Sequence, residues 1–382
     1  MNMALWNDEQ HRPLQHIRVI DTSVMLPGPL LTRILAQHGA DVIKVEKLPG
    51  GDPIRDFDDS NLHELLNHGK RSLALDLQKE EGKAVLKQLV EEADLFVESY
   101  REGIMDQLGL GYADLSEINP DLLYFSLRGF AGKEAGHAGH DINFIAASGC
   151  GEWFIESGNP NYSTQFGDLV GGVMVPAIKL LVHLANPARR GMHVVSNMDE
   201  NFRMLYLPRA FDEFKSGGNG GEYHTLQEHL DGSRPHSRFY RCRDNRWVSL
   251  NAVQDKHWKA FCEMVDHEEW IPRKDDPKLV PDLVQLFEDA PSSYWDALAT
   301  KKEACLRKVT TWEEQLNYSQ TKPQLSADPL SWCGFLPNLS LTKAPALGQD
   351  TFTLLHSLGA TNKEISALAD AGVILKPNNP TS

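Results

Sequence analysis

The sequence predicts an α/β protein, with a Rossmann-like large domain that has a mostly parallel sheet plus a smaller α+β domain. Two observations favour this fold. Strand and helix patterns alternate up to residue 127, and a different pattern takes over after about residue 215. Strands that alternate with helices form parallel sheets, because each helix returns the chain to the edge where the previous strand began. The length of 382 residues favours two domains.

The first part of the chain consists of repeated strand–helix units. A strand is expected at 17–20, followed by a helix at 29–37 that a proline opens and a second strand at 42–45. The glycine within residues 38–41 ends the helix. The same alternation continues in the following elements: strand 72–75, helix 80–92, and strands 95–97 and 122–127.

The second part begins after a glycine-rich segment at 215–221, whose composition is typical of a flexible linker. Two short strands at 239–242 and 247–250 flank an Asp-Asn turn and predict a hairpin. The helices expected from the pattern are 257–265 and 281–288 in this part, and 354–358 and 363–369 in the C-terminal tail. The hairpin and its helices therefore predict a small α+β domain.

The composition excludes several classes of protein. Hydrophobic residues make up 41% and charged residues 24%, which argues against disorder. The formal net charge of -15 argues against nucleic-acid binding, which needs a basic surface. The five cysteines contain no CxxC pair, so we expect reduced thiols and neither a disulfide framework nor a zinc site. They are Cys150, Cys242, Cys262, Cys305 and Cys333.

No secretion signal, membrane span or dinucleotide site is expected. Residues 1–15 are polar and lack the apolar core of a secretory signal. The longest apolar stretch, 169–185, contains Lys179 and His183, so it predicts a buried helix and not a membrane span. The loop at 21–29 has one glycine and two prolines where nicotinamide and flavin enzymes require GxGxxG. We therefore expect a cytoplasmic protein that does not bind a dinucleotide.

Two residues carry the chemistry that the sequence offers. His140 lies in the motif GHDINF (139–144), and an imidazole titrates near neutral pH without perturbation. Asp168 lies in FGDLVGG (166–172), before an apolar helix whose N-terminus it can cap and which stabilises a carboxylate. The flanking glycines let a substrate approach the backbone. Such a pair can move a proton between two faces of a carbon, or the carboxylate alone can attack a thioester.

Short motifs stand in one order along nearly the whole chain. They are PGP (27–29), GADVIKVE (39–46), GGD (50–52), GKRSLALD (69–76), GLG (109–111), INP (118–120), APALG (344–348), LG (358–359) and AGVI (371–374). In this order they resemble the family III CoA-transferase superfamily (CaiB/BaiF type), which includes the α-methylacyl-CoA racemases. The resemblance implies an interlocked homodimer and the following parts: a large CoA-binding domain at 1–215 and 335–382, a small domain at 222–330, and linkers near 215–222 and 330–340.

The motif around His140 resembles the racemases most. Racemases carry GHDINY here and this chain differs only by Phe144, whereas oxalate-type transferases carry a tyrosine at the position of His140. Leu26 stands where those transferases place a glutamine. Gln254 departs from the racemase pattern, which has a glutamate that orients the histidine. An amide can accept a hydrogen bond but does not stabilise an imidazolium as a carboxylate does.

The resemblance also implies a set of contacts to CoA, whose phosphates need lysine or arginine partners. Lys47 follows the second strand and Arg101 follows the strand at 95–97. Gln78 stands where the family commonly has a lysine, and Lys79 is next. The residues implied to contact CoA are Lys47, Leu75, Asp76, Leu77, Gln78, Lys79, Arg101, Gly139, Asp141 and Asn143. Between the two catalytic motifs, Trp153, Phe154 and Tyr162 either line an acyl pocket or pack in a core.

Three functions stay open. The first is racemisation at the α-carbon of a 2-methylacyl-CoA in fatty acid metabolism, in which His140 and Asp168 exchange the α-proton through an enolate. The second is CoA transfer between carboxylic acids through an anhydride on Asp168, which needs no histidine. The third is an inactive CoA-binding protein. No metal and no prosthetic group are expected, because CoA enters as part of the acyl-CoA substrate. The expected partner is a second copy of the chain, with no nucleic acid and no membrane.

Overall fold

The computed structural model describes residues 12–57, 61–151, 155, 164–186, 191–207, 232–320 and 343–376. By its internal contacts the chain forms two compact units. Unit 1 comprises Met1–Met204 with Gln324–Ser382, and unit 2 comprises Leu205–Pro323. The segments expected to be linkers, 215–222 and 330–340, lie outside the described residues.

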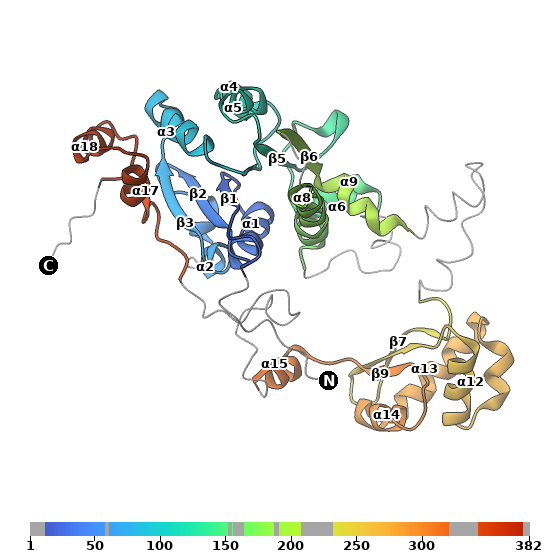
Figure 1. Ribbon diagram of the computed structural model, residues 1–382. Helices are drawn as coiled ribbons and strands as arrows, with labels where there is room; N and C mark the ends of the chain where they lie inside the picture. The colour runs from blue at the N-terminus through green and yellow to red at the C-terminus, as the bar shows by residue number, and fades with distance from the viewer. Residues whose placement is uncertain are drawn as a thin grey trace. The chain divides into compact units, whose positions relative to one another are not determined.

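Unit 1 contains a six-stranded sheet in the order β3-β2-β1-β4-β5-β6, and every neighbouring pair is parallel (Figure 1). The strands are β1 (Arg18–Asp21), β2 (Asp41–Lys47), β3 (Arg71–Leu75), β4 (Leu95–Glu98), β5 (Leu123–Arg128) and β6 (Met192–Asn197). The predicted α/β class is confirmed, and each predicted strand of this sheet matches an observed one within two residues at either end. The edge strand β6 was not predicted, because its sequence, MHVVSN, is short and mixed in polarity.

Helices cover both faces of this sheet. The helical elements are α1 (Pro27–Gln37), η1 (Pro53–Asp56), α2 (Asn61–Asn67), α3 (Glu80–Val90), α4 (Ile104–Gln107), α5 (Tyr112–Ile118), η3 (Gly132–Glu134), α6 (Asp141–Ser148), η4 (Gly167–Met174), α8 (Val175–Leu184), α9 (Met198–Phe202), η5 (Arg203–Tyr206), α17 (Thr351–Ser357) and α18 (Asn362–Asp370). Helix α1 begins at Pro27, two residues before the predicted start. It ends before Gly39, whose φ of 100° is the left-handed conformation that favours glycine.

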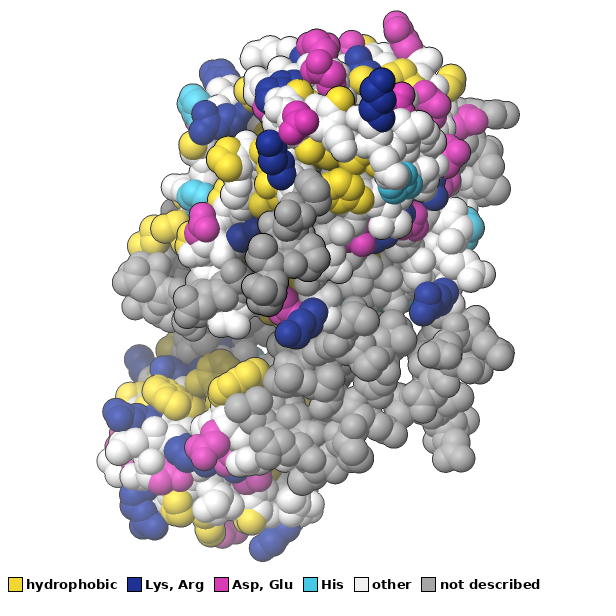
Figure 2. Space-filling model, turned by 90° about the vertical axis from the view of Figure 1, so that its left-hand side faces the viewer, with side chains coloured by type: hydrophobic (Ala, Val, Ile, Leu, Met, Phe, Trp, Pro, Cys, Tyr) yellow, Lys and Arg dark blue, Asp and Glu magenta, His cyan; other side chains and the backbone are white. Residues whose placement is uncertain are grey.

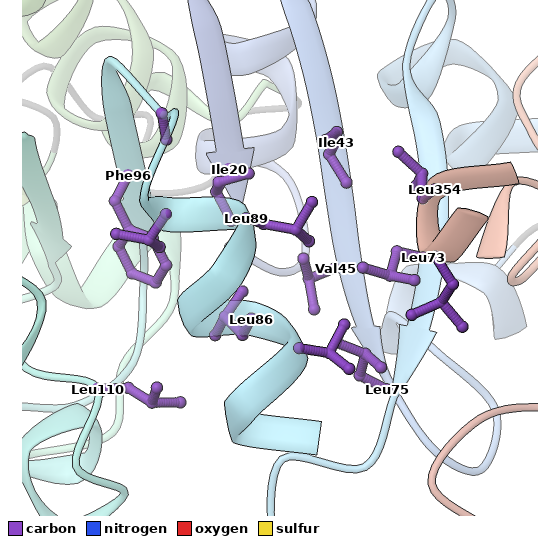
Figure 3. Packing of buried hydrophobic residues seen from close by; sticks show 14 of the residues in the cluster. Ile20, Ile43, Val45, Leu73, Leu75, Leu86, Leu89, Phe96, Leu110 and Leu354 are labelled. Carbon is purple, nitrogen blue, oxygen red and sulfur yellow. The ribbon is translucent and has the colours of Figure 1, made fainter. Parts of the chain in front are cut away.

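The period of two along a strand divides the core into two layers. Ile20 packs on the face covered by α3, α17 and α18, where Leu86 and Leu89 of α3 lie over Val45 and Leu75 (Figure 3). Its neighbour Val19 packs on the opposite face, in the layer that includes residues of α1 and α8. A sheet buried on both faces needs continuous apolar strands, as the sequence of β4 and β5 shows.

The strand order indicates where a ligand-binding crevice is expected. The order 3-2-1-4-5-6 is that of dinucleotide-binding domains, and the order reverses between β1 and β4. In such open sheets ligands bind outside the carboxyl ends of the strands at this point. The loops that follow β1, β4 and β5 are therefore the first place to look for a site.

Unit 2 contains a three-stranded antiparallel sheet of β7 (Ser237–Arg241), β8 (Trp247–Asn251) and β9 (Leu306–Lys308). The predicted hairpin is confirmed as β7 and β8. The helical elements of this unit are α12 (Asp255–Met264), η6 (Glu268–Arg273), η7 (Pro277–Leu279), α13 (Val280–Glu288), α14 (Ser292–Ala299) and α15 (Trp312–Gln320). Its core is rich in aromatic rings, among them Trp258, Phe287 and Trp295. Gln254 is exposed and directly precedes α12.

The apolar stretch 169–185 differs from the prediction. It forms the continuous helical segment of η4 and α8, and its sheet-facing side is buried at Ala177 and Leu180. Its other side is exposed: Met174 is 57%, Ile178 58% and Val182 64% accessible. The prediction of a wholly buried helix is therefore wrong, because the sheet covers one side of a helix that is apolar on both sides. Among the described helices this is the one long and apolar enough to cross a membrane, and the core helix of a folded protein passes the same test.

Candidate active site

Two adjoining cavities open at the carboxyl ends of β1, β4 and β5. The first, which we call the aspartate cavity, has a volume of about 310 Å³ and is lined by residues that include Leu26, Ile54, Phe57, Leu127, His140 and Asp168. The second, the arginine cavity, has a volume of about 240 Å³ and is lined by residues that include Tyr100, Arg101, Arg128, His137 and His140. His140 and Gly139 line both, so the predicted histidine lies where an apolar cavity meets a cationic one.

His140 immediately precedes α6. Its backbone amide donates a hydrogen bond to Oδ1 of Asn143 at 3.1 Å, and the Asn143 amide donates to the His140 carbonyl at 2.8 Å. Asn143 thus fixes the backbone of the histidine. Gly139 allows the close approach of the Phe130 ring, which a Cβ at this position would meet at 2.5 Å. The His140 side chain itself is exposed in unit 1.

Asp168 is the most strongly perturbed acid of the two cavities. Burial, followed by the negative charge of Asp141, raises the pKa of Asp168 from 3.8 to about 7. Burial also raises the pKa of Asp141, although the amides of Asp168 and Gly167 oppose this by hydrogen bonding to it. A carboxyl group with a pKa near 7 is present both as acid and as carboxylate at neutral pH, which suits proton transfer.

Two expectations about Asp168 need correction. It does not cap a helix, because Phe166 is the N-cap residue and Asp168 is the second residue of η4. Its environment does not stabilise the carboxylate, because burial and the charge of Asp141 both raise its pKa. The nearby glycines also have another role than substrate access. A Cβ on Gly171 would lie 2.5 Å from the Met198 carbonyl oxygen, so this glycine lets η4 pack on α9.

Asp141 connects the two predicted catalytic residues. It follows His140 as the first residue of α6, and its Oδ1 accepts a hydrogen bond from the Asp168 amide at 2.9 Å. The same carboxylate therefore joins the start of α6 to the start of η4. Because the amides of a first helical turn have no acceptor within the helix, the Asp141 and Ile142 amides are available to a negatively charged oxygen.

A buried network of charges holds the loop at 22–26, which forms one wall of the aspartate cavity. Lys44 lies 2.8 Å from Asp52 and donates to the Ser23 carbonyl at 2.6 Å. Oδ1 of Asp52 accepts a hydrogen bond from the amide of Met25, whose φ is 67°. Sequence reasoning missed this network. Its signal was a lysine between the apolar residues Ile43 and Val45 of strand β2, since a charge is buried only with a partner.

The arginine cavity contains a second charge that sequence reasoning missed. Arg128 ends β5, forms an ion pair with the buried carboxylate of Glu98, and donates to the Tyr100 carbonyl at 2.8 Å. Burial, as the largest cause, raises the pKa of Glu98. Arg128 thus fixes the backbone next to Arg101. The polar residues at the carboxyl ends of β4 and β5 were the signal that could have identified this cavity from the sequence.

The structure brings only some of the predicted CoA contacts together. Arg101 and Gly139 line the arginine cavity, whereas Lys47 and residues 75–79 line neither cavity. Lys47 ends β2 and is exposed, and Leu75 is fully buried at the end of β3. The residues that follow, Asp76, Leu77, Gln78 and Lys79, form the turn before α3.

Lys79 already has partners within the chain. It donates hydrogen bonds to the carbonyls of Ala371 and Gly372 at 2.6 and 3.0 Å. Trp153, Phe154 and Tyr162 lie outside the described residues. Among the residues that the structure does describe, no cluster of three or more histidine, cysteine or acidic side chains could hold a metal ion.

A third cavity of about 550 Å³ lies between α3, α17 and α18. Its lining is mainly aliphatic, with Glu81 and Glu364 as its acidic members, and it contains neither His140 nor Asp168. Figure 2 views the side of the molecule on which these helices lie, and basic and acidic side chains are interspersed over its described residues. The predicted catalytic residues therefore lie at the two smaller cavities and not at this one.

Comparison with known proteins relates this chain to CoA enzymes. The model of "CoA-transferase family III" matches residues 14–331. The human α-methylacyl-CoA racemase is 28% identical over 94% of this chain and 97% of its own length. The succinyl-CoA:mesaconate CoA-transferase of Haloarcula hispanica is 29% identical over 78% of this chain and 74% of its own.

A solved structure supports the fold. The crystal structure of a CAIB/BAIF family protein from Brucella suis superposes with a TM-score of 0.71 at 22% identity, covering 91% of this chain and all of that one. At this identity the superposition establishes the fold alone, whereas the family model extends over most of the sequence. The chain belongs to CoA-transferase family III, an enzyme family whose members use CoA thioesters as substrates.

Proposed function

We propose that this enzyme is an acyl-CoA racemase that transfers a proton at the α-carbon of a 2-methylacyl-CoA. The observation that carries the proposal is that Asp168, with a pKa of about 7, lines the same cavity as His140. Racemisation needs two groups that exchange protons with the α-carbon, and an imidazole and a carboxyl group are two side chains that perform such general acid–base chemistry. The aliphatic lining of the aspartate cavity suits a branched hydrocarbon chain.

The reaction follows from this arrangement. The thioester acidifies the α-hydrogen, and neutral His140 takes it as a proton, leaving an enolate. The amides at the start of α6 donate hydrogen bonds to the enolate oxygen. Asp168, in its protonated form, gives its proton to the opposite face of the α-carbon, and the two residues exchange roles for the other enantiomer. The product is the opposite enantiomer, and one proton has been removed and one returned.

The arginine cavity is the proposed path for the CoA moiety. Arg101 and Arg128 bring two guanidinium groups to the cavity that shares His140 with the aspartate cavity. A diphosphate is recognised by such planar donors. CoA is then part of the substrate, and the mechanism requires no prosthetic group.

CoA transfer between carboxylic acids is the second candidate. In this reaction ionised Asp168 attacks the acyl carbon, the C–S bond breaks, and CoA leaves as a thiolate that later attacks a second activated acid. Two facts favour it: relatives that are transferases match about as well as the racemases, and Gln254 replaces the glutamate of the racemase pattern. The transfer mechanism gives no role to His140, although His140 lines the same cavity as Asp168.

The deciding experiment follows deuterium at the α-carbon. A 2-methylacyl-CoA incubated with the enzyme in deuterated water should exchange its α-hydrogen with no free acid present. Asp168→Asn should lower this rate by several orders of magnitude, and His140→Ala should remove nearly all racemisation. Matched controls are Asp370→Asn at the end of α18 and His356→Ala on α17, both exposed. Turnover that requires a free acid and survives His140→Ala would establish the transferase instead.

We also propose that the enzyme is a cytoplasmic homodimer of fatty acid metabolism. The exposed apolar side of η4 and α8, with Met174, Ile178 and Val182, is a surface that monomers rarely leave in water. A second copy of the chain would cover it. The cytoplasmic location is supported by the free thiols of the four described cysteines, since secreted proteins oxidise such residues.

A further inference from the structure

The helix that carries Asp168 is wound with an unusual register. Segment η4 is a π-helix, in which the Val175 amide donates to the Val170 carbonyl five residues earlier. In a π-helix each hydrogen bond spans one more residue than in an α-helix, and such segments are frequent at functional sites. Asp168 lies in the first turn of this segment. The register of η4 therefore decides where its carboxyl group points.

This register leaves the carbonyl of Gly171 without a helical partner. In an α-helix its donor would be the Val175 amide, which here serves Val170. In a π-helix its donor would be residue 176, which is a proline and has no N–H. A buried carbonyl without a hydrogen bond costs stability, so another group must supply the donor.

Asn201 supplies it. Its Nδ2 donates to the Gly171 carbonyl at 2.7 Å and to Oγ of Ser196 at 2.9 Å. Its Oδ1 accepts a hydrogen bond from Nζ of Lys179 at 2.6 Å. Because a lysine ammonium only donates, the amide oxygen must face Lys179, and the amide nitrogen then faces Gly171. Asn201 is 4% accessible, so water does not substitute for this contact.

The contact selects one of two registers. If the segment rewound to an α-helix, the Val175 amide would serve Gly171, and Pro176 would leave the Gly172 carbonyl without its donor instead. Pro176 thus removes one hydrogen bond in either register. The carbonyl that the π register leaves without a helical donor, that of Gly171, is the one that Asn201 contacts. Rewinding by one residue would turn the preceding helical residues by about 100° relative to α8. That rotation would move Asp168 away from the cavity that it shares with His140.

We infer that Asn201 is a positioning residue for Asp168. It accepts a hydrogen bond from Lys179 and donates one to the Gly171 carbonyl, and it thereby holds η4 in the π register that directs the Asp168 carboxyl group into the aspartate cavity. This rests on the proposed role of Asp168, which both candidate reactions share. Asn201 lines neither of the two cavities, so it acts through the helix.

The test compares Asn201→Asp with Asn197→Asp. Both changes replace an amide by a carboxylate of the same shape, but Asn197 only donates to the exposed Glu200 at the start of α9. Asn201→Asp removes the donor to Gly171. We expect its kcat for α-exchange to fall about 100-fold, as for a misplaced catalytic group, with the Kd for free CoA within about twofold. The apparent pKa of its activity should fall below 7, because a displaced Asp168 leaves its buried site beside Asp141. Asn197→Asp should change none of these.

A second variant keeps the inference testable if Asn201→Asp does not fold. Lys179→Met removes the group that orients the amide and should lower kcat with a smaller effect than Asn201→Asp. Normal kcat and pH profiles in a folded Asn201→Asp, or in Lys179→Met if that is the only folded variant, would overturn the inference. Asp168→Asn is measured alongside in exchange and in transfer assays. If it is inactive while the Asn201 and Lys179 variants behave normally, only this inference fails. If it is fully active, the proposed function and this inference fail together.

Discussion

Asp168→Asn should make the protein more stable at alkaline pH while it abolishes activity. Burial and the charge of Asp141 raise the pKa of Asp168 from 3.8 to about 7, so the folded protein binds this proton more tightly than the unfolded chain does. Below pH 3.8 both states carry the proton and the residue has no effect on stability. Between about pH 4 and 7 the unfolded chain has released it, and stability falls as pH rises. Above pH 7 both states are ionised and the loss is complete.

The size of the effect follows from the shift. A difference of 3.2 pKa units between about 7 and 3.8 corresponds to about 4 kcal/mol at 1.36 kcal/mol per unit. Because the carboxyl group is partly accessible to solvent, we expect roughly half of this value, about 2 kcal/mol. Asparagine has nearly the same volume and carries no charge at any pH, so the variant should avoid this loss.

Urea unfolding of both proteins at pH 5 and pH 8, at one ionic strength, measures the difference. At pH 5 about two fifths of the loss is already present, so the variant should gain about 0.8 kcal/mol there and about 2 kcal/mol at pH 8. Asp370→Asn, at an exposed aspartate that pairs with Lys376, controls for the loss of one negative charge. A variant whose gain is the same at both pH values, or that is less stable at pH 8, would show that the folded protein does not hold Asp168 as a buried, raised acid.

Two further predictions concern neighbouring features. Asp141→Asn keeps an oxygen for the Asp168 amide but removes the negative charge. The apparent pKa in the pH profile of kcat/KM should therefore fall below 7, and it should stay above 3.8 because burial is the larger cause of the shift. An unchanged or higher pKa would contradict the coupling between Asp141 and Asp168. Ile178→Glu places a charge on the exposed apolar side of α8, so light scattering should report that the proposed dimer is weakened or has become a monomer. Ile104→Glu, at an exposed residue of α4, is the control and should leave the dimer unchanged. If Ile178→Glu also leaves it unchanged, the interface does not lie on this side of α8.

The strands of the sheet could be predicted because their sequences depend on local rules. β1, β4 and β5 are short apolar runs between polar turns, and burial on both faces requires that pattern. β6 could not be found in this way. It lies at the sheet edge with five of its six residues partly or fully exposed, so its sequence needs few apolar side chains.

The convergence of His140 and Asp168 was expected from the resemblance to a family, and the residues alone did not predict it. The raised pKa of Asp168 could not be predicted at all. It depends first on burial and then on the charge of Asp141, which is 27 positions away in the sequence and reaches Asp168 only because α6 packs on η4. Lys44 was visible as a charge between two apolar residues of β2, but the sequence does not show that Asp52 is the partner that compensates it.

The register of η4 shows why a sequence can identify a site residue without giving the position of its side chain. GDLVGGVM has no feature that distinguishes a π-helix from an α-helix, since both bury one side of an apolar segment. The difference comes from Pro176, which removes one donor, and from Asn201, which supplies another from a different helix. Neither residue by itself predicts a π-helix from the sequence. The position of the reacting carboxyl group is therefore a property of the packed fold, set by a hydrogen bond between segments that are 30 positions apart in the chain.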